Sequence, residues 1–403
     1  KSLSEAKSLA AEEDEYDSTF FVPERARWNN IKDLKHDIGS ELNKVTEAIE
    51  ASLARNGLSA HLSRVGCLGL CFAEPLVDIQ LPYGPRVFYG NVTPESVDEI
   101  IKAHIGQGVP PPELALGYLV GESDNGAGVV STALPPWLLH GEIPDLNQHP
   151  MRASETRIAL RNAGNIDPSD IYQYLAVGGY QALHKALTEM TAEEMLDQVA
   201  ASGLRGRGGA AFPAATKWKF LAGSSAPVKY VLCNCEEGDP GAFNDKAILE
   251  SDPHTLIEGI LLCGYATGAS HGYIFIRHGH DGPIERAKEA VRQAKELGFI
   301  GSSIFGSDFD FELEVALTGD SYVAGEETAL MEAIEGTDVT LEAVKDSIDL
   351  NTFGLMAAVG KIELENIRGR ARMGVRGRAT KGKITGTGKY GYGVDAGLPV
   401  IKE

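Results

Sequence analysis

The sequence predicts a mixed α/β protein that is built on a mainly parallel sheet. Strand-like runs at residues 229–233, 272–277 and 309–317 alternate with helix-like segments at residues 245–259 and 283–297, and this alternation is typical of βαβ units. A helix, two strands and a closing helix nearer the N-terminus predict a second, smaller α/β domain. A chain of 403 residues is long enough for two or three domains with separate cores.

The small domain begins with a predicted helix at residues 31–56, which ends at Gly57 as helices commonly do. One face of this helix carries an apolar stripe made of Leu34, Ile38, Leu42, Val45 and Ile49. Strands are predicted at residues 75–81 and 86–89, on either side of a Pro-Tyr-Gly-Pro turn. Thr93 is the expected cap of a last helix at residues 94–104 that has proline in its first position.

The connecting segments have a different composition. Residues 1–17 are acidic and polar, which predicts a disordered or draped arm. Residues 105–157 are rich in glycine and proline and lack sustained periodicity, so we expect a linker there. Beyond residue 336, the segments 341–348 and 350–367 are helix candidates.

Charge and cysteine content narrow the functional classes. The net charge is −20 at pH 7, which argues against nucleic-acid binding by the main domains. No apolar run is long enough to span a bilayer, and the five cysteines lack a regular disulfide spacing, which indicates a reducing compartment or metal ligation. We expect a soluble protein of the cytoplasm, or of the mitochondrial matrix or plastid stroma after transit-peptide removal, that can sit peripherally on a membrane complex.

Two glycine-rich segments carry the functional signal. Residues 203–218 read GLRGRGGAAFPAATKW, and residues 233–246 read CNCEEGDPGAFNDK. Glycines in the first segment allow backbone N–H groups to turn inward and form a nest for phosphate. A lone glycine run is more often a structural turn, but this loop is long and an acidic, glycine-rich turn follows it, which favours nucleotide binding.

These segments, together with TGDSYVAGEETAL at residues 318–330, resemble the flavin- and NADH-binding subunit of respiratory complex I. The same module occurs in NAD-linked hydrogenases and formate dehydrogenases, and the resemblance covers about residues 175–336. It implies a Rossmann-like FMN- and NADH-binding domain whose partners are other subunits of a large electron-transfer complex. FMN and NADH are the cofactors that the resemblance implies.

The resemblance implies a role for each residue of the glycine loop. Gly206, Gly208 and Gly209 would approach the flavin and its phosphate, and Lys217 would pair with that phosphate. Phe212 would offer an aromatic face to the dinucleotide.

The acidic turn and the segment after the last strand complete the implied site. Asn234 would contact the flavin ring system, Glu236 takes the place of a usual aspartate, and Glu237 would be the catalytic acidic residue near the nicotinamide. The flavin pocket would also be lined by Tyr322, Gly325, Glu326 and Glu327.

Several positions depart from the family pattern. Ala211, Ala214 and Ala215 stand where the family has Gly, Thr and Gly, and an alanine in such a loop must block the ligand or adopt a positive φ. An Asn-Asn-x-Glu-Thr segment, which the family places against the flavin phosphate, is missing after residue 336. His278 and His280 are expected to be surface loop histidines.

A C-x3-C pair, Cys67 and Cys71, stands just before a predicted strand. With the helix at residues 94–104, it resembles the thioredoxin-like two-iron ferredoxin domain that accompanies the flavin subunit. A two-iron cluster needs four thiolates, and residues 20–30, where the other pair is expected, contain no cysteine. A metal shared with a partner chain and a disulfide are alternatives, but we favour two remnant buried thiols and expect neither a 2Fe-2S nor a 4Fe-4S cluster in this chain.

The C-terminal segment at residues 368–389 is basic and rich in glycine. It predicts a phosphate- or nucleic-acid-binding arm, a tail that docks on an acidic partner, or simple disorder. No nucleic-acid motif is evident, so we favour a tail that a partner orders.

The domain plan that results has five parts. These are an N-terminal arm (1–30), a thioredoxin-like ferredoxin-type domain (31–105), an extended linker (106–157), a complex I flavoprotein-like domain (158–336), and C-terminal helices with a basic tail (337–403). The predicted function is that of a diaphorase-type flavoprotein subunit that transfers hydride from NADH to FMN. The alternative is a redox-silent relative that serves as a scaffold subunit of a large complex.

Overall fold

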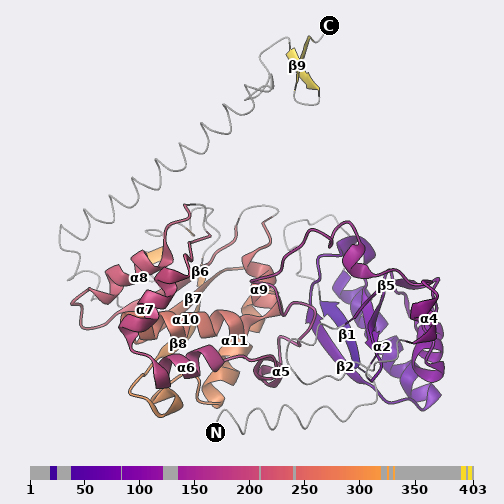
Figure 1. The fold of residues 1–403 in the computed structure, drawn as a ribbon, viewed down its shortest axis with the longest axis horizontal. Helices are drawn as coiled ribbons and strands as arrows, with labels where there is room; N and C mark the ends of the chain where they lie inside the picture. The colour runs from indigo at the N-terminus through magenta and orange to yellow at the C-terminus, as the bar shows by residue number, and fades with distance from the viewer. Residues whose placement is uncertain are drawn as a thin grey trace. The chain divides into compact units, whose positions relative to one another are not determined.

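The computed structural model describes residues 19–24, 38–82, 84–120, 135–207, 210–238, 242–318, 325, 330–331, 392–395 and 398–401 (Figure 1). The chain divides into two compact units. The first comprises Lys1–Met190, Tyr230–Tyr265 and Ala269–Val339, and the second comprises Thr191–Lys229, Ala266–Gly268 and Thr340–Glu403.

A five-stranded mixed sheet, in the order β2-β1-β3-β4-β5, forms the N-terminal part of the first unit. Its strands are β1 (Thr19–Glu24), β2 (His61–Gly66), β3 (Val77–Gln80), β4 (Arg86–Tyr89) and β5 (Ala115–Leu119). β1 runs parallel to β2, whereas the β1–β3, β3–β4 and β4–β5 pairs are antiparallel. The predicted thioredoxin-like α/β domain is therefore confirmed at the level of fold class.

Two helices cover one face of this sheet. They are α2 (Ile38–Asn56) and α3 (Pro94–Ile100), which continues as a π-helical turn over Ile101–Gly106. The apolar stripe predicted for α2 is buried wherever the structure describes it, at Leu42, Val45 and Ile49, and it packs with Val87 and Tyr89 of β4. Phe88 lies between these two residues in the sequence and packs in a separate cluster, as the two-residue period of a strand requires.

Three strands of this sheet were not predicted. β1 and β2 were missed, and β5 lies inside the predicted linker, so the expectation that this segment is only a connection was wrong. Gly117 allows β5 to pack closely against the segment that contains Pro144, because a Cβ at this position would lie 2.9 Å from the carbonyl oxygen of Pro144. Short edge strands that carry glycine leave little periodic signal.

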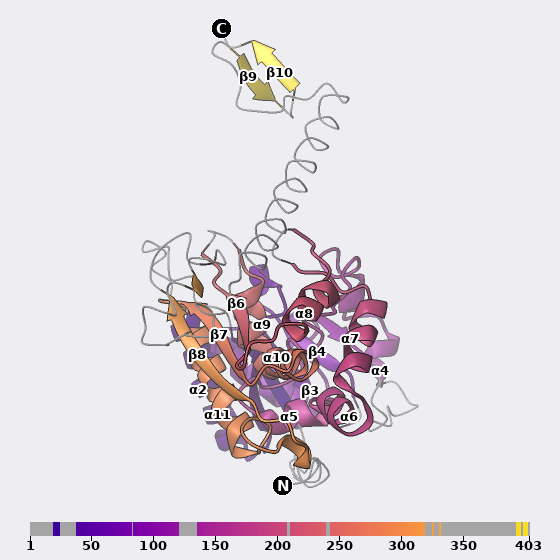
Figure 2. The ribbon, with the colours of Figure 1, turned by 90° about the vertical axis from the view of Figure 1, so that its left-hand side faces the viewer.

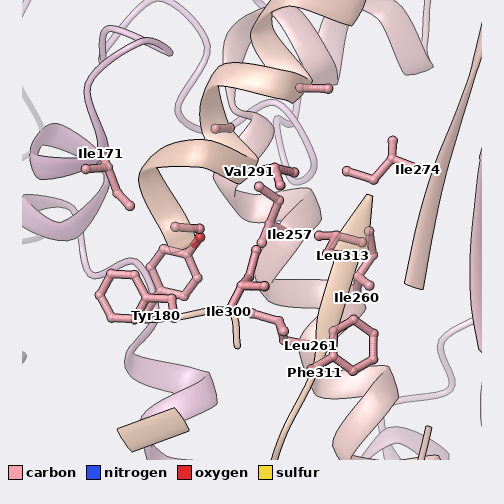
Figure 3. Packing of buried hydrophobic residues seen from close by; sticks show 14 of the residues in the cluster. Ile171, Tyr180, Ile257, Ile260, Leu261, Ile274, Val291, Ile300, Phe311 and Leu313 are labelled. Carbon is pink, nitrogen blue, oxygen red and sulfur yellow. The ribbon is translucent and has the colours of Figure 1, made fainter. Parts of the chain in front are cut away.

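The second sheet of the first unit is parallel, as predicted, with the order β6-β7-β8. Its strands are β6 (Tyr230–Cys235), β7 (His271–Arg277) and β8 (Glu312–Thr318). Figure 3 shows Ile257, Ile260 and Leu261 of α10 packed beside Ile274 of β7 and Leu313 of β8. Burial of these branched apolar side chains is the main favourable contribution to the free energy of folding of this layer.

The helix expected at residues 245–259 is two helices, α9 (Asp245–Ser251) and α10 (Pro253–Thr267). Asp252 between them has φ −158° and ψ 63°. Pro253 disfavours helical geometry in the residue before it and has no N–H to donate. The prediction of one helix was therefore wrong, and the proline is the physical reason.

The remaining helices of the first unit are labelled in a second view (Figure 2). They are α4 (Pro136–Leu139), α5 (Ile171–Ala176), α6 (Gln181–Glu189) and α11 (Asp281–Glu296), with 3-10 turns at Cys71–Ala73, Leu146–Gln148 and Ile304–Gly306. In the second unit, α7 (Ala192–Ala201) and α8 (Ala214–Ala222) are helices, and β9 (Tyr392–Asp395) pairs with β10 (Leu398–Ile401). In the described part of the chain, no helix is both long and apolar enough to cross a membrane.

Candidate functional site

The carboxyl ends of β6 and β7 bring polar residues to one edge of the parallel sheet. The two strands pair in parallel register, so residues that follow them lie at the same edge, where ligands of open α/β sheets bind. Asn234, near the end of β6, donates from Nδ2 to the carbonyl oxygen of Gly325 at 2.7 Å. The structure therefore brings together two of the predicted site residues that are far apart in the sequence.

Glu236 is held at this edge by an ion pair that the sequence did not predict. Arg277 Nη1 donates to Glu236 Oε1 at 2.8 Å, and both side chains are largely buried. Two glycines pack against the pair, because a Cβ at Gly238 would lie 2.4 Å from Arg277 Nη1 and one at Gly325 would lie 2.8 Å from Glu236 Oε2. A larger residue at either position would therefore have to displace the ends of the Arg277 or Glu236 side chains.

Glu237 binds the first turn of α9. Its carboxylate accepts from the backbone N–H groups of Asn244 at 2.5 Å, Asp245 at 3.2 Å and Lys246 at 3.1 Å. An acidic side chain at a helix N-terminus satisfies otherwise unpaired N–H groups. Burial and the neighbouring carboxylate of Glu237 raise the pKa of Asp245 to about 6.

His280 belongs to the same edge, and the expectation of a surface histidine was wrong for this residue. Its side chain is buried, with 9% relative exposure, and Nδ1 has no hydrogen-bond partner among the described residues. Burial lowers its pKa, and the positive charges of Lys246 and Arg277 lower it further. The sequence feature that could have indicated this burial is the position of His280, three residues after Arg277 at the end of β7.

The glycine loop lies in the second unit and opens α8. The loop is closed by a backbone bridge between Arg205 and Pro213, and Gly206 N–H donates to the carbonyl oxygen of Phe212 at 2.8 Å. Ala211 has φ +54°, which confirms that alanine here is forced into the left-handed region. The N-terminus of α8 follows immediately, and a helix N-terminus attracts anions.

Lys217 stands on α8 beside this loop, and its side chain is exposed. Phe212 is half-buried and Gly206 is exposed. A Cβ at Gly206 would meet only the carbonyl oxygen of Phe212, at 3.7 Å. Gly206 is therefore exposed, although its N–H is paired with Phe212, and the positive charge of Lys217 is the described feature that fits a phosphate group.

The other predicted site residues lie outside the described residues. They are Gly208, Gly209, Tyr322, Glu326 and Glu327.

The cysteine pair in the first unit lies in the loop after β2. Cys67 is half-buried, whereas Cys71 is exposed, so the expectation of two buried thiols was wrong for Cys71. Burial raises the pKa of the Cys67 thiol to about 12. All five cysteines lie in the described part of the chain, and each is a thiol rather than half of a disulfide.

Comparison with known families and relatives agrees with the resemblance. Residues 199–359 match the Nuo51 FMN-binding domain, and residues 1–64 match the HsdM N-terminal domain. The chain is 48% identical over 182 residues to the HndC component of an NADP-reducing hydrogenase of Solidesulfovibrio fructosivorans, which covers 45% of this chain and 37% of that protein. It is 49% identical over 177 residues to an NADH-quinone oxidoreductase component of Aquifex aeolicus, covering 44% of this chain and 41% of that protein.

The corresponding NADH-quinone oxidoreductase component of Escherichia coli is 37% identical over 188 residues, and the match covers 46% of this chain and 42% of that protein. The chain thus spans about two fifths of the length of these curated relatives. Among solved structures, an NAD+-reducing [NiFe]-hydrogenase aligns over 83% of this chain and 49% of its own, with 21% identity and a TM-score of 0.36. A thioredoxin-like [2Fe-2S] ferredoxin from Aquifex aeolicus aligns over 27% of this chain and 97% of its own, with 22% identity and a TM-score of 0.22.

Proposed function

Starting from the match of residues 199–359 to the Nuo51 FMN-binding domain, we propose that this chain is an NADH-oxidising flavoprotein subunit of a multisubunit electron-transfer complex. The observation that carries the proposal is the glycine loop that opens α8 inside the matched segment. A nest of backbone N–H groups before a helix N-terminus is a general way to bind a phosphate.

The residues present fit FMN in the following way. Gly206, with Gly208 and Gly209, gives the flavin phosphate access to the backbone, and Lys217 neutralises its charge. FMN, when bound, accepts a hydride from NADH and releases the electrons one at a time. Phe212 offers an aromatic face to the dinucleotide.

By the resemblance, the edge of the parallel sheet in the first unit orients polar parts of the cofactors. Asn234 is fixed by Gly325 and Glu236 by Arg277, so both are held in one orientation. The remaining proposed contacts come from Tyr322, Glu326 and Glu327. Glu237 remains the proposed acidic residue near the nicotinamide, and its binding to α9 holds the carboxylate in place.

We also propose that the chain's own cysteines do not hold a 2Fe-2S or 4Fe-4S cluster, since Cys67 and Cys71 supply two of the four thiolates that a cluster needs. Electrons would therefore leave through a neighbouring subunit. The five thiols support a reducing compartment.

A redox-silent scaffold subunit is the second candidate function. Two observations favour it: Ala211 carries a methyl group where the loop approaches the ligand, and the carboxylate of Glu237 already accepts three backbone hydrogen bonds. The basic tail at residues 368–389 is proposed to dock on an acidic partner surface in either case.

The test is to denature the purified full-length chain and to quantify the released flavin by absorbance and fluorescence. Near-stoichiometric FMN supports the flavoprotein, and its absence from folded, assembled protein supports the scaffold. Lys217→Met should weaken FMN binding roughly tenfold to a hundredfold, because a charge-assisted contact is worth about 1.5–3 kcal/mol.

Lys219→Met is the matched control, since Lys219 lies on the same helix and forms an exposed ion pair with Asp197 at 2.9 Å. Such pairs contribute about 0–1 kcal/mol, so FMN binding should be unchanged. Equal losses in the two variants would contradict the role of Lys217.

A further inference from the structure

Three potential metal ligands converge in the loop after β2. The donor atoms of Cys67, Cys71 and Glu74 all lie within 4.8 Å of one another. In the described ranges, no other group of three or more His, Cys, Asp or Glu side chains has this arrangement. The cluster lies in the loop that follows β2 and shares no residue with the proposed flavin site.

The backbone of the loop orients the sulfur of Cys67. Gly69 has φ +79°, a conformation that glycine adopts readily, and its N–H donates to Cys67 Sγ at 3.3 Å. This hydrogen bond favours the thiolate, but burial outweighs it and raises the pKa of Cys67 to about 12, so an ion must displace the thiol proton when it binds.

A 3-10 turn then reverses the direction of the chain, so that the side chain of Glu74 lies near Cys67. The turn covers Cys71–Ala73 and is closed by a hydrogen bond from Ala73 N–H to the carbonyl oxygen of Leu70 at 2.9 Å. Cys67 Sγ lies 3.5 Å from Glu74 Oε1. The ligands therefore come from one short segment with a fixed backbone.

Packing around the loop keeps this geometry in place. Arg157 Nη2 donates to the carbonyl oxygen of Leu68 at 2.5 Å, and Leu68, Leu70 and Ala73 are buried. Gly164 approaches so closely that a Cβ there would lie 2.3 Å from Leu68 Cδ2. A loop held in this way needs little reorganisation to accept an ion.

The separation of Cys67 and Glu74 suits a tetrahedral zinc ion. With Zn–S of about 2.3 Å and Zn–O of about 2.0 Å, a tetrahedral site separates its sulfur and oxygen ligands by about 3.5 Å. The Cys67 thiol, which donates to Glu74 Oε1, lies 3.5 Å from that oxygen. Thiolate ligands disfavour magnesium and calcium, which prefer oxygen. Cys71 is exposed, so an ion can enter from solvent and keep a water as its fourth ligand.

We propose that Cys67, Cys71 and Glu74 bind a single Zn²⁺ ion, with solvent in the fourth position, in place of a two-iron cluster. Two thiolates and one carboxylate are enough for a mononuclear zinc site with three protein ligands. The ion would cross-link the two ends of the loop between β2 and β3.

The test is to strip the full-length chain with a chelator and titrate it with Co²⁺, whose bonds to thiolate give a charge-transfer absorption band. One equivalent should bind and produce this band, and Zn²⁺ should displace it. Cys71→Ser should weaken Co²⁺ binding at least tenfold and reduce the band, and Glu74→Gln should weaken binding roughly tenfold while the band remains.

Two controls separate the site from general effects of mutation. Glu142→Gln changes an exposed acid elsewhere in the chain, and Cys263→Ala removes a thiol from α10. Neither should change the stoichiometry or the affinity. Because Cys71 is exposed, its replacement should leave the circular dichroism spectrum of the folded protein unchanged, so that the loss of binding can be read directly.

Three results would overturn the proposal. The first is Co²⁺ binding that is unaffected in Cys71→Ser, and the second is the absence of Co²⁺ binding by the parent chain at micromolar metal. The third is purified protein that contains iron and acid-labile sulfide in equal amounts and no zinc, which would show that a cluster is completed by other thiolates.

Discussion

Ala211 has a backbone conformation that alanine rarely adopts. Its φ of +54° places it in the left-handed region, where the Cβ atom of an L-residue is crowded by the following carbonyl oxygen. The strain lies in the loop that carries Gly206 and precedes α8. The Cβ methyl group of Ala211 is therefore a source of backbone strain in the loop that we propose binds the flavin phosphate.

We expect Ala211→Gly to stabilise the protein by about 0.5–1 kcal/mol. Removal of the left-handed penalty of about 1–2 kcal/mol exceeds the entropy of about 0.4–1 kcal/mol that glycine adds to the unfolded chain. Urea unfolding of the two proteins measures the difference.

Ala214→Gly is the control for this prediction, because Ala214 is the first residue of α8. Glycine in a helix lowers stability by up to about 1 kcal/mol, so the two substitutions should have opposite signs. A loss of stability in Ala211→Gly would mean that the loop is not strained.

Three candidate residues of the sheet edge were named from the sequence, but the ion-pair partner of Glu236 was not. Asn234, Glu236 and Gly325 stand in recognisable motifs, and the structure brings them together. The pair of Arg277 with Glu236 depends on the register of β6 and β7, which the local sequence does not reveal. His280 was misplaced for the same reason, since burial is a property of the packed sheet.

At the scale of elements, α9 joins two parts of the first unit. Glu237 binds its first turn, and its last residue, Ser251, lies against Gly66 at the end of β2. A Cβ at Gly66 would lie 2.3 Å from Ser251 Cβ and 2.7 Å from Ser251 Cα. A backbone atom cannot move away as a flexible side chain can, so the glycine is required.

Gly66→Ala should therefore lower the free energy of unfolding by about 1–3 kcal/mol, which is the usual cost of overpacking. The measurement is equilibrium urea unfolding at neutral pH. The matched control is Gly259→Ala in α10, where a Cβ would meet nothing within 4 Å.

In that control, alanine should stabilise the helix by up to about 1 kcal/mol, because it loses less backbone entropy than glycine. If both substitutions proved neutral, the contact between β2 and α9 would not be tight.

At the scale of the whole molecule, buried titratable groups set the response to acid. Burial lowers the pKa of His104 and of His254 to about 4. Burial raises the pKa of Asp78 to about 6, although its ion pair with Arg86 acts in the opposite direction. The histidines and the aspartate therefore have opposite effects on stability between about pH 4 and pH 6.

The sign for the histidines follows from proton uptake. Between about pH 6.5 and pH 4, an unfolded histidine binds a proton and the buried one does not, so stability falls as the pH falls. The unfolding free energy of the wild type, relative to that of His104→Gln, should fall by about 1.4 kcal/mol for each pH unit in this range.

For Asp78 the trend should be the reverse. The unfolding free energy of the wild type, relative to that of Asp78→Asn, should rise as the pH falls below about 6, because the folded wild type gains a proton before the unfolded chain does. Urea unfolding at several pH values between 4 and 7.5 checks both variants. A constant difference between wild type and His104→Gln would show that His104 titrates normally.

Much of the fold could be predicted because its signals are local. The alternation of strand-like and helix-like segments around β6, β7 and β8 predicted the parallel sheet. The apolar stripe on α2 predicted the helix that packs on the N-terminal sheet. β5 could not be predicted, since a short edge strand with Gly117 at its centre depends on pairing with β4. The break at Pro253 had a local signal, but the apolar run on both sides of it concealed the boundary.

The ion pair of Arg86 with Asp78 also connects the first sheet to the segment at residues 162–165. The guanidinium of Arg86 also donates to the carbonyl oxygen of Gly164 at 2.7 Å and to Asn165 Oδ1 at 2.6 Å, and Asn162 binds Asp252 at 2.7 Å. The segment around residues 162–165 thus supplies partners to a charge at the first sheet and to Asp252, between α9 and α10. Replacement of the N-terminal sheet by an unrelated domain would leave the carbonyl group of Gly164 and the side-chain oxygen of Asn165 without the guanidinium that donates to them.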